Sequence, residues 1–92
     1  MRVKVVLERE RGVYRPSYGH KDTGTGDLHL TYRSVKNRRV AVLQLLGAER
    51  KFPNLYDPKL IELSATQMRF VGSEPVDNAW VMQEWICELL PA

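Results

Sequence analysis

The stretch PVDNAWVMQEWICELL (Pro75–Leu90) decides the fold class, because it fits two different secondary structures. As a strand it has two apolar faces, one with Val81, Trp85, Cys87 and Leu89 and the other with Trp80, Met82 and Ile86. As a helix over residues 77–90, it gathers its acidic residues within about 40° of one another, opposite a broad apolar arc. The aromatic and β-branched residues and the preceding Asp77–Asn78 turn signal favour the strand. The alternative is an α+β fold in which this helix packs across a sheet.

The segment before it has the pattern of another hairpin. Residues 59–64 and 68–72 are strand-like, and residues 64–67 are short enough to form the turn between them. Asp57–Pro58 would also suit the start of a helix, with an N-cap followed by proline in the first turn. The apolar spacing that follows fits a helix poorly, so we expect strands here, after a polar connection over residues 47–58.

Two further segments predict a hairpin in the middle of the chain. Residues 27–33 alternate between apolar and polar side chains, and residues 39–46 are apolar on both faces, as in a central strand. Residues 34–38 between them form a turn, in which Asn37 tolerates left-handed geometry.

The N-terminal part adds one clear strand and one glycine-rich segment. Residues 2–8 alternate with period two, Gly12 suits a tight reversal, and residues 13–15 are expected to return as a short strand. Residues 16–26 have loop composition. We therefore predict one domain, residues 1–92, of the all-β class: a small antiparallel meander or open barrel of five to six strands.

The glycine-rich segment does not match a nucleotide-binding motif. Its lysine, Lys21, lies inside the loop, and a strand rather than a helix follows. The side chains of His20, Asp22, Asp27 and His29 are of types that bind transition metals. A glycine-rich loop does not hold ligands in register, so we expect solvated polar residues, no metal and no cofactor.

Catalysis finds little support in the sequence. Cys87 is the only cysteine and lies in an apolar stretch, far in sequence from His20 and His29. We expect it to be a small buried hydrophobic residue rather than a nucleophile. No catalytic residues and no small-molecule substrate are therefore predicted, and the chain is not expected to be an enzyme.

Charge is distributed unevenly along the chain. Residues 1–56 hold twelve Lys and Arg against five Asp and Glu, whereas residues 57–92 hold two against six. Basic residues with tyrosines nearby suit a nucleic-acid surface of low sequence specificity, because cations neutralise phosphates and rings stack on bases. The candidate residues for this surface are Arg9, Arg11, Tyr14, Arg15, Tyr32, Arg33, Lys36, Arg38, Arg39, Arg50 and Lys51.

The first functional hypothesis is a protein-interaction or adaptor module. As a strand, the C-terminal segment would place Trp80, Met82 and Ile86 outside the core, as a docking patch or dimer seam. A homodimer, or a small accessory or inhibitory protein like those of phages and mobile elements, would have this character.

No apolar run approaches the length of about 20 residues that a membrane span needs. No targeting segment is visible, so we expect a soluble, cytoplasmic protein; nucleic-acid binding is the alternative function.

Overall fold

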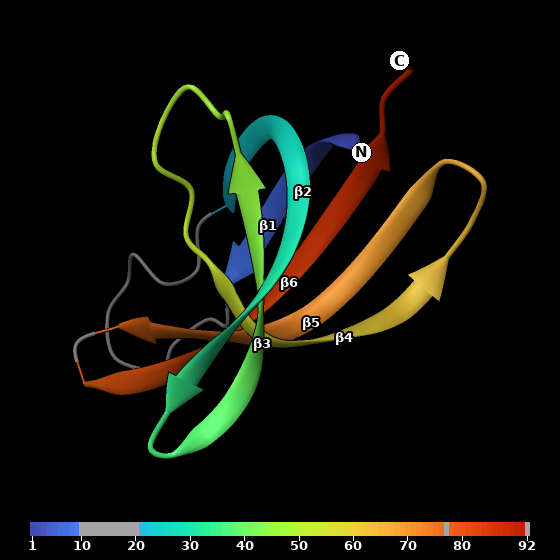
Figure 1. The fold of residues 1–92 in the computed structure, drawn as a ribbon. Coiled ribbons are helices and arrows are strands. Elements are labelled where there is room, and N and C mark those ends of the chain that lie inside the picture. Colours follow the sequence, from blue (N-terminus) through green and yellow to red (C-terminus); the bar gives the residue numbers. More distant parts are fainter. Residues whose placement is uncertain (10–20, 77, 92) are drawn as a thin grey trace.

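The computed structural model describes residues 1–9, 21–76 and 78–91, and these form an antiparallel β-barrel (Figure 1). The strands are β1 (Arg2–Arg9), β2 (Lys21–Val35), β3 (Arg38–Leu46), β4 (Leu55–Leu63), β5 (Gln67–Val76) and β6 (Ala79–Leu89). Each strand pairs with the next one in sequence, and β6 pairs with β1, so that the barrel closes. The predicted all-β antiparallel class is confirmed, and the described residues contain no helix that could cross a membrane.

The C-terminal segment is a strand, so the helical alternative for residues 77–90 is wrong. β6 pairs with β5 from Val76↔Ala79 to Gln67↔Glu88, and it pairs with β1 along its other edge. Asn78, in the connection between β5 and β6, has a φ of 67°. The predicted faces are confirmed, because Val81, Trp85 and Cys87 are fully buried, as is the residue between them, Gln83, whereas Trp80 and Met82 are exposed.

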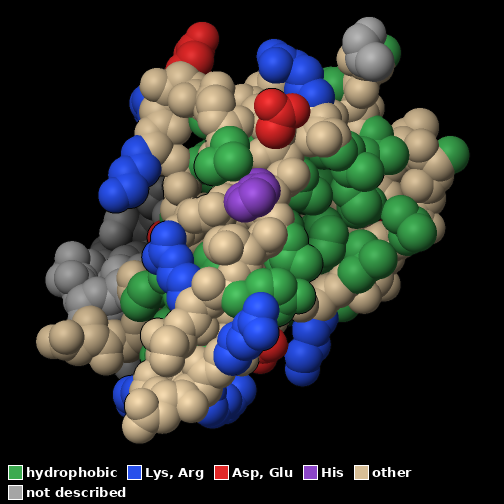
Figure 2. All heavy atoms as spheres, in the orientation of Figure 1, with side chains coloured by type: hydrophobic (Ala, Val, Ile, Leu, Met, Phe, Trp, Pro, Cys, Tyr) green, Lys and Arg blue, Asp and Glu red, His purple; other side chains and the backbone are tan. Residues whose placement is uncertain are grey.

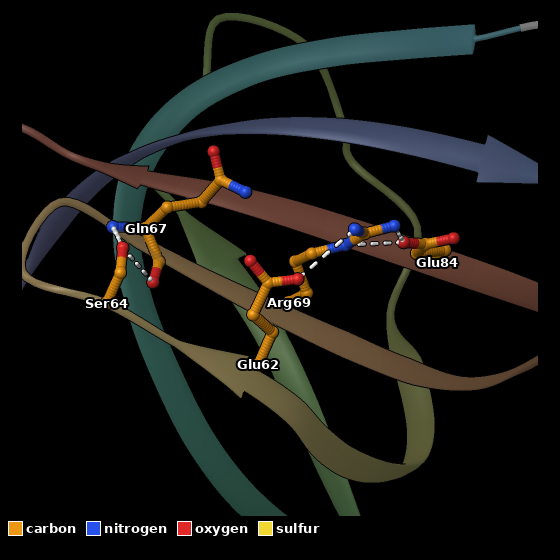
Figure 3. Close-up of polar contacts among 5 residues, drawn as sticks. All are labelled: Glu62, Ser64, Gln67, Arg69 and Glu84. Atoms are coloured by element: carbon orange, nitrogen blue, oxygen red, sulfur yellow. Dashed lines mark hydrogen bonds and ion pairs between the residues drawn. The ribbon is translucent and has the colours of Figure 1, made fainter.

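Both other predicted hairpins are present. Between β2 and β3, Lys36 and Asn37 have φ values of 48° and 64°, the backbone of a two-residue type I′ turn. Between β4 and β5, the Ser64 amide donates to the Gln67 carbonyl at 2.9 Å, and the Ser64 Oγ accepts from the Gln67 amide at 3.1 Å (Figure 3).

The prediction of a loop over residues 16–26 is wrong for its second half. β2 begins at Lys21, and Val3↔Gly26 and Val5↔Gly24 are paired residues of β1 and β2. A Cβ on Gly24 would lie 2.8 Å from the Phe52 ring, and a Cβ on Gly26 would lie 2.3 Å from the Leu46 carbonyl oxygen. Neither position has room for a side chain, so the two glycines allow β2 to pack closely against Phe52 and β3. They belong to a strand and not to a loop. The predicted turn at Gly12 and the returning strand at 13–15 lie outside the described residues.

β4 also begins earlier than predicted, inside the expected polar connection. Leu55 is buried and pairs with Leu43, and Tyr56 pairs with Val42. No helix starts at Asp57–Pro58: Asp57 has a φ of 52°, and the pairing of β4 with β5 shifts register between Tyr56 and Lys59. The chain bends here because a left-handed residue followed by proline, which lacks an amide hydrogen, cannot continue the ladder with β3.

Because the chain bends at Asp57–Pro58, only two residue pairs join β3 to β4. Beyond Tyr56, β4 turns away from β3 and is paired only with β5, as Figure 1 shows on the side of the β4–β5 hairpin. β3 has a neighbour on each side and buries both Val42 and Leu43, in accord with the expected central strand.

The core of the barrel is formed by residues of β1, β3, β4, β5 and β6 and of the connection between β3 and β4, and the half-buried Leu28 of β2 packs against it. Its residues are Val3, Val5, Leu7, Leu43, Leu45, Phe52, Leu55, Met68, Trp85 and Cys87. Phe52, from the connection, stands edge-on to the Trp85 ring with 5.3 Å between centroids. It thereby fixes the segment 47–54 against the barrel.

Candidate interaction surfaces

The basic residues of the β2–β3 hairpin do not share one face. Tyr32 is paired with Ala41 on the inner side of the hairpin, and the Arg39 guanidinium lies over its ring, 4.5 Å from the centroid. Arg33 belongs to the opposite, outer side, because the side chains of a strand alternate. The predicted arginine–tyrosine surface is therefore divided into two parts.

The outer part contains an ordered aromatic group. Arg33 Nη1 donates to the Tyr56 hydroxyl at 2.9 Å, and the Tyr56 ring stands edge-on to Trp80 with 5.4 Å between centroids. These rings line a hollow of about 250 Å³ together with Lys36 and Arg38. Strands β2, β3, β4 and β6 and the β2–β3 turn thus bring two rings and three cations together.

A larger hollow lies beside the connection between β3 and β4. It measures about 480 Å³ and is lined by Arg2 and Lys4 of β1, by Thr23 and Thr25 of β2, and by Arg50 and Lys51. Arg50 and Lys51 were predicted as basic candidates, but Arg2 and Lys4 were not. The signal was present, since the alternation of residues 2–8 places both cations on the wet face of the strand.

A third hollow, of about 420 Å³, is lined in part by the same residues as the hollow beside the connection between β3 and β4. It shares Arg50 and Lys51 with the largest hollow, and it includes Arg33, the residue that holds Tyr56. The carboxylates that line the three hollows are Glu49 and Asp57. Within the described part of the chain, carboxylates form ion pairs with Arg69 and with none of these cations.

Four other nucleic-acid candidates have no described side chain. Arg11, Tyr14 and Arg15 lie outside the described residues, and Arg9 ends β1 without a described side chain. Their part in any surface stays a prediction.

An apolar surface lies where β4 leaves β3. Leu60 pairs with Phe70, Leu63 pairs with the buried Met68, and Leu30 pairs with the buried Leu43. Paired residues point to the same side of a sheet, so these three leucines belong to the inner face of the barrel. They are nevertheless 50%, 67% and 51% exposed, because no strand covers them after β3 and β4 diverge.

We call this surface the apolar seam: Leu30, Leu60, Ile61 and Leu63. On the same face, the half-buried Leu28 and Phe70 pack against the core. Figure 2 shows a large area of hydrophobic side chains on the side of the β4–β5 hairpin, with most Lys and Arg side chains to the left of it and below it. Sequence reasoning missed the seam as a site, because each of its residues fits the inner face of an ordinary strand.

The predicted interface of Trp80, Met82 and Ile86 is only partly brought together. All three lie on the outer face of β6, where Trp80 and Met82 are each 49% exposed and Ile86 is half-buried. Glu84 lies between Met82 and Ile86 and is bound by Arg69 (Figure 3). A charged group therefore interrupts the row, and Trp80 belongs with Tyr56 in the outer aromatic group.

The Arg69 side chain joins the outer faces of three strands. Its Nε donates to Glu84 Oε1 at 2.7 Å, and its Nη1 lies 3.2 Å from Glu62 Oε2. The hydrogen bond to Glu84 raises the pKa of the guanidinium further, with a smaller contribution from Glu62. Arg69 is thus occupied within the protein and does not add to the basic hollows.

Catalytic and metal chemistry find no constellation among the described residues. Burial raises the pKa of the Cys87 thiol to about 12, so the reactive thiolate is not formed near neutral pH. No group of three His, Cys, Asp or Glu side chains that could hold a metal occurs in the described part of the chain. Asp27 and His29 are exposed on β2.

No protein-family model, no curated protein and no solved structure matches this chain. Its function therefore has to be argued from the chemistry of its surfaces.

Proposed function

We propose that this chain is a small non-enzymatic protein-binding module whose partner covers the apolar seam. The observation that supports it is the exposure of Leu30, Leu60 and Leu63 on the inner face of a closed barrel. Contiguous exposed apolar surface on a small domain typically marks a binding site, because leaving it in water costs about 25 cal/mol per Å².

The partner is expected to dock through apolar side chains and not by adding a strand to β4. The free edge of β4 carries Pro58, the charged residues Lys59 and Glu62, and a register irregularity between Leu60 and Glu62. Proline, charge and bulges are the features that discourage edge-to-edge pairing. The matching partner surface is a segment that presents leucine-like side chains, on another protein or on a second copy of this chain.

Site-specific photo-crosslinking tests the proposal. A photoreactive residue at position 63 is compared with one at position 88, because Leu63 belongs to the seam and Glu88 is exposed on the outer face of β6. We expect a discrete crosslinked product at position 63 that disappears when Leu60→Asp is added, and no such product at position 88. A product of twice the chain mass identifies a second copy as the partner.

Circular dichroism and thermal unfolding of the Leu60→Asp variant provide the control for folding. Leu60 is half exposed, so the substitution should leave the barrel intact. Equal crosslinking at both positions, or a product at position 63 that survives Leu60→Asp in a folded variant, would contradict docking at the seam.

A further inference from the structure

We propose that single-stranded nucleic acid binds along the outer side of β1, β2 and β3, on a surface separate from the apolar seam. We call this surface the basic track. It consists of Arg2, Lys4, Arg33, Lys36, Arg38, Arg50 and Lys51, which line the three hollows described above.

The charge of the track suits a phosphodiester chain. Seven cations line its hollows, against the carboxylates of Glu49 and Asp57. Asp27 and Glu88 face the same side through their pairing with Arg2 and Lys4, but they line none of the three hollows. Among the described residues, no carboxylate forms an ion pair with these cations, so an anion that binds here would break no ion pair within that part of the chain.

The three hollows are linked by shared or contacting residues. The largest of the three hollows shares Arg50 and Lys51 with the third hollow, which is also lined by Arg33. Arg33 in turn holds Tyr56, which lines the aromatic hollow. A chain with repeated negative charges can follow such a path, whereas a single small anion would use only one part of it.

Two features of the largest hollow fit phosphate groups. Thr23 and Thr25 add hydroxyl donors beside the cations of β1, and hydroxyl and cationic side chains are the usual partners of phosphate oxygens. Phe52 packs on Trp85 and holds the segment that carries Arg50 and Lys51 against the barrel. The cations are therefore presented by a fixed segment, which reduces the entropy lost on binding.

The aromatic end of the track favours an unpaired strand. Trp80 is 49% exposed, and its ring is held by the edge-on contact with Tyr56. A base can stack on such a ring only when it is not enclosed in a duplex. The combination of cations and a supported ring therefore distinguishes single strands from duplexes and from polyanions without bases.

Fluorescence anisotropy with a labelled oligothymidine, its matched duplex and heparin tests the proposal. We expect the oligothymidine to bind more tightly than the duplex and with a steep salt dependence, about 0.7 log units of affinity per log unit of salt for each phosphate contacted. Trp80→Ala should weaken oligothymidine binding by about 5- to 150-fold, the effect of losing one stacked base, and leave heparin binding unchanged.

The matched control uses two lysines with the same change of charge. Lys51 belongs to the track, whereas Lys59 is exposed on β4 and lines none of the hollows. Lys51→Glu should weaken binding and reduce the salt slope by at least about 0.7, and Lys59→Glu should have little effect. Both side chains are exposed, so both variants should fold.

Three results would overturn the proposal. The first is no binding of oligothymidine at low salt. The second is equal loss of affinity for Lys51→Glu and Lys59→Glu, which would indicate a response to net charge alone. The third is equal affinity for oligothymidine, duplex and heparin with no effect of Trp80→Ala, which would indicate a general polyanion surface.

Discussion

The indole Nε1 of Trp85 donates a hydrogen bond of 3.2 Å to the side-chain carbonyl oxygen of Gln83, in the interior of the barrel. Gln83 is 2% exposed, and its amide nitrogen donates to the Glu74 carboxylate. A polar residue on the inner face of β6 therefore allows the largest side chain of the core to be buried with its donor satisfied.

We expect Gln83→Met to lower the free energy of unfolding by about 1–3 kcal/mol, because it preserves most of the volume and removes the acceptor for the buried indole. Urea unfolding followed by tryptophan fluorescence measures this. Gln67→Met is the control, since the β4–β5 turn bonds use only the backbone of Gln67. An equal effect of both substitutions would show that the interior hydrogen bond contributes nothing specific.

We expect the buried Cys87 thiol to make the protein less stable at alkaline pH. Its folded pKa is raised to about 12, whereas an unfolded thiol titrates near 8.5, so the unfolded state loses its proton first. The contribution of this thiol to the free energy of unfolding is fully present below about pH 8.5. It is lost as the pH rises towards 12, by about 1.4 kcal/mol per pH unit. Denaturant unfolding at several pH values should show this extra slope in the native chain and not in Cys87→Ala. Identical slopes would contradict a buried, protonated thiol.

The barrel has no room for a side chain at Gly72. A Cβ there would lie 2.7 Å from Leu55 Cγ and 2.7 Å from the Tyr56 carbonyl oxygen, and the backbone oxygen cannot move without disturbing β4. Gly72→Ala should therefore destabilise the protein by about 1–3 kcal/mol in thermal or denaturant unfolding. Gly47 is the contrasting position: it has open space and a φ of 79°, so Gly47→Asn should be nearly neutral. A neutral Gly72→Ala would show that β4 and β5 separate more readily than their pairing indicates.

The β2–β3 turn is expected to be open to improvement. Lys36 and Asn37 both have left-handed φ values, which suit asparagine and glycine better than lysine and asparagine. Lys36→Asn combined with Asn37→Gly should raise the free energy of unfolding by about 1 kcal/mol, the typical cost of a left-handed backbone at an ordinary residue. A decrease on thermal unfolding would contradict the two-residue turn.

Much of the fold follows from alternation that is visible in the sequence. The two faces of β6, the β2–β3 hairpin and the β4–β5 hairpin are each encoded by neighbouring residues. The segment Thr23–Gly26 was misread because glycine normally marks a loop. Its threonines and glycines in fact continue the period of two into the following strand, with the glycines on the crowded inner side.

The surfaces were harder to predict, because they depend on strands meeting in space. Arg2 and Arg50 are far apart in sequence and share a hollow only after Phe52 docks on Trp85. The apolar seam arises from the bend at Asp57, and nothing local distinguishes Leu60 there from a leucine in a covered strand. Local patterns thus predicted the elements and their faces, whereas the divergence of β3 and β4 is a property of the assembled barrel.

That divergence bears on how the barrel moves. Ten residue pairs hold β5 to β6, but only Val42–Tyr56 and Leu43–Leu55 hold β3 to β4. Local opening should require the least free energy at this junction, so backbone amides there should exchange with deuterium sooner than those between β5 and β6. A partner that packs beside the junction would stabilise the paired state of β3 and β4. Increased protection of the Leu55 and Tyr56 amides from exchange would then indicate that a partner is bound, even where these amides do not contact it.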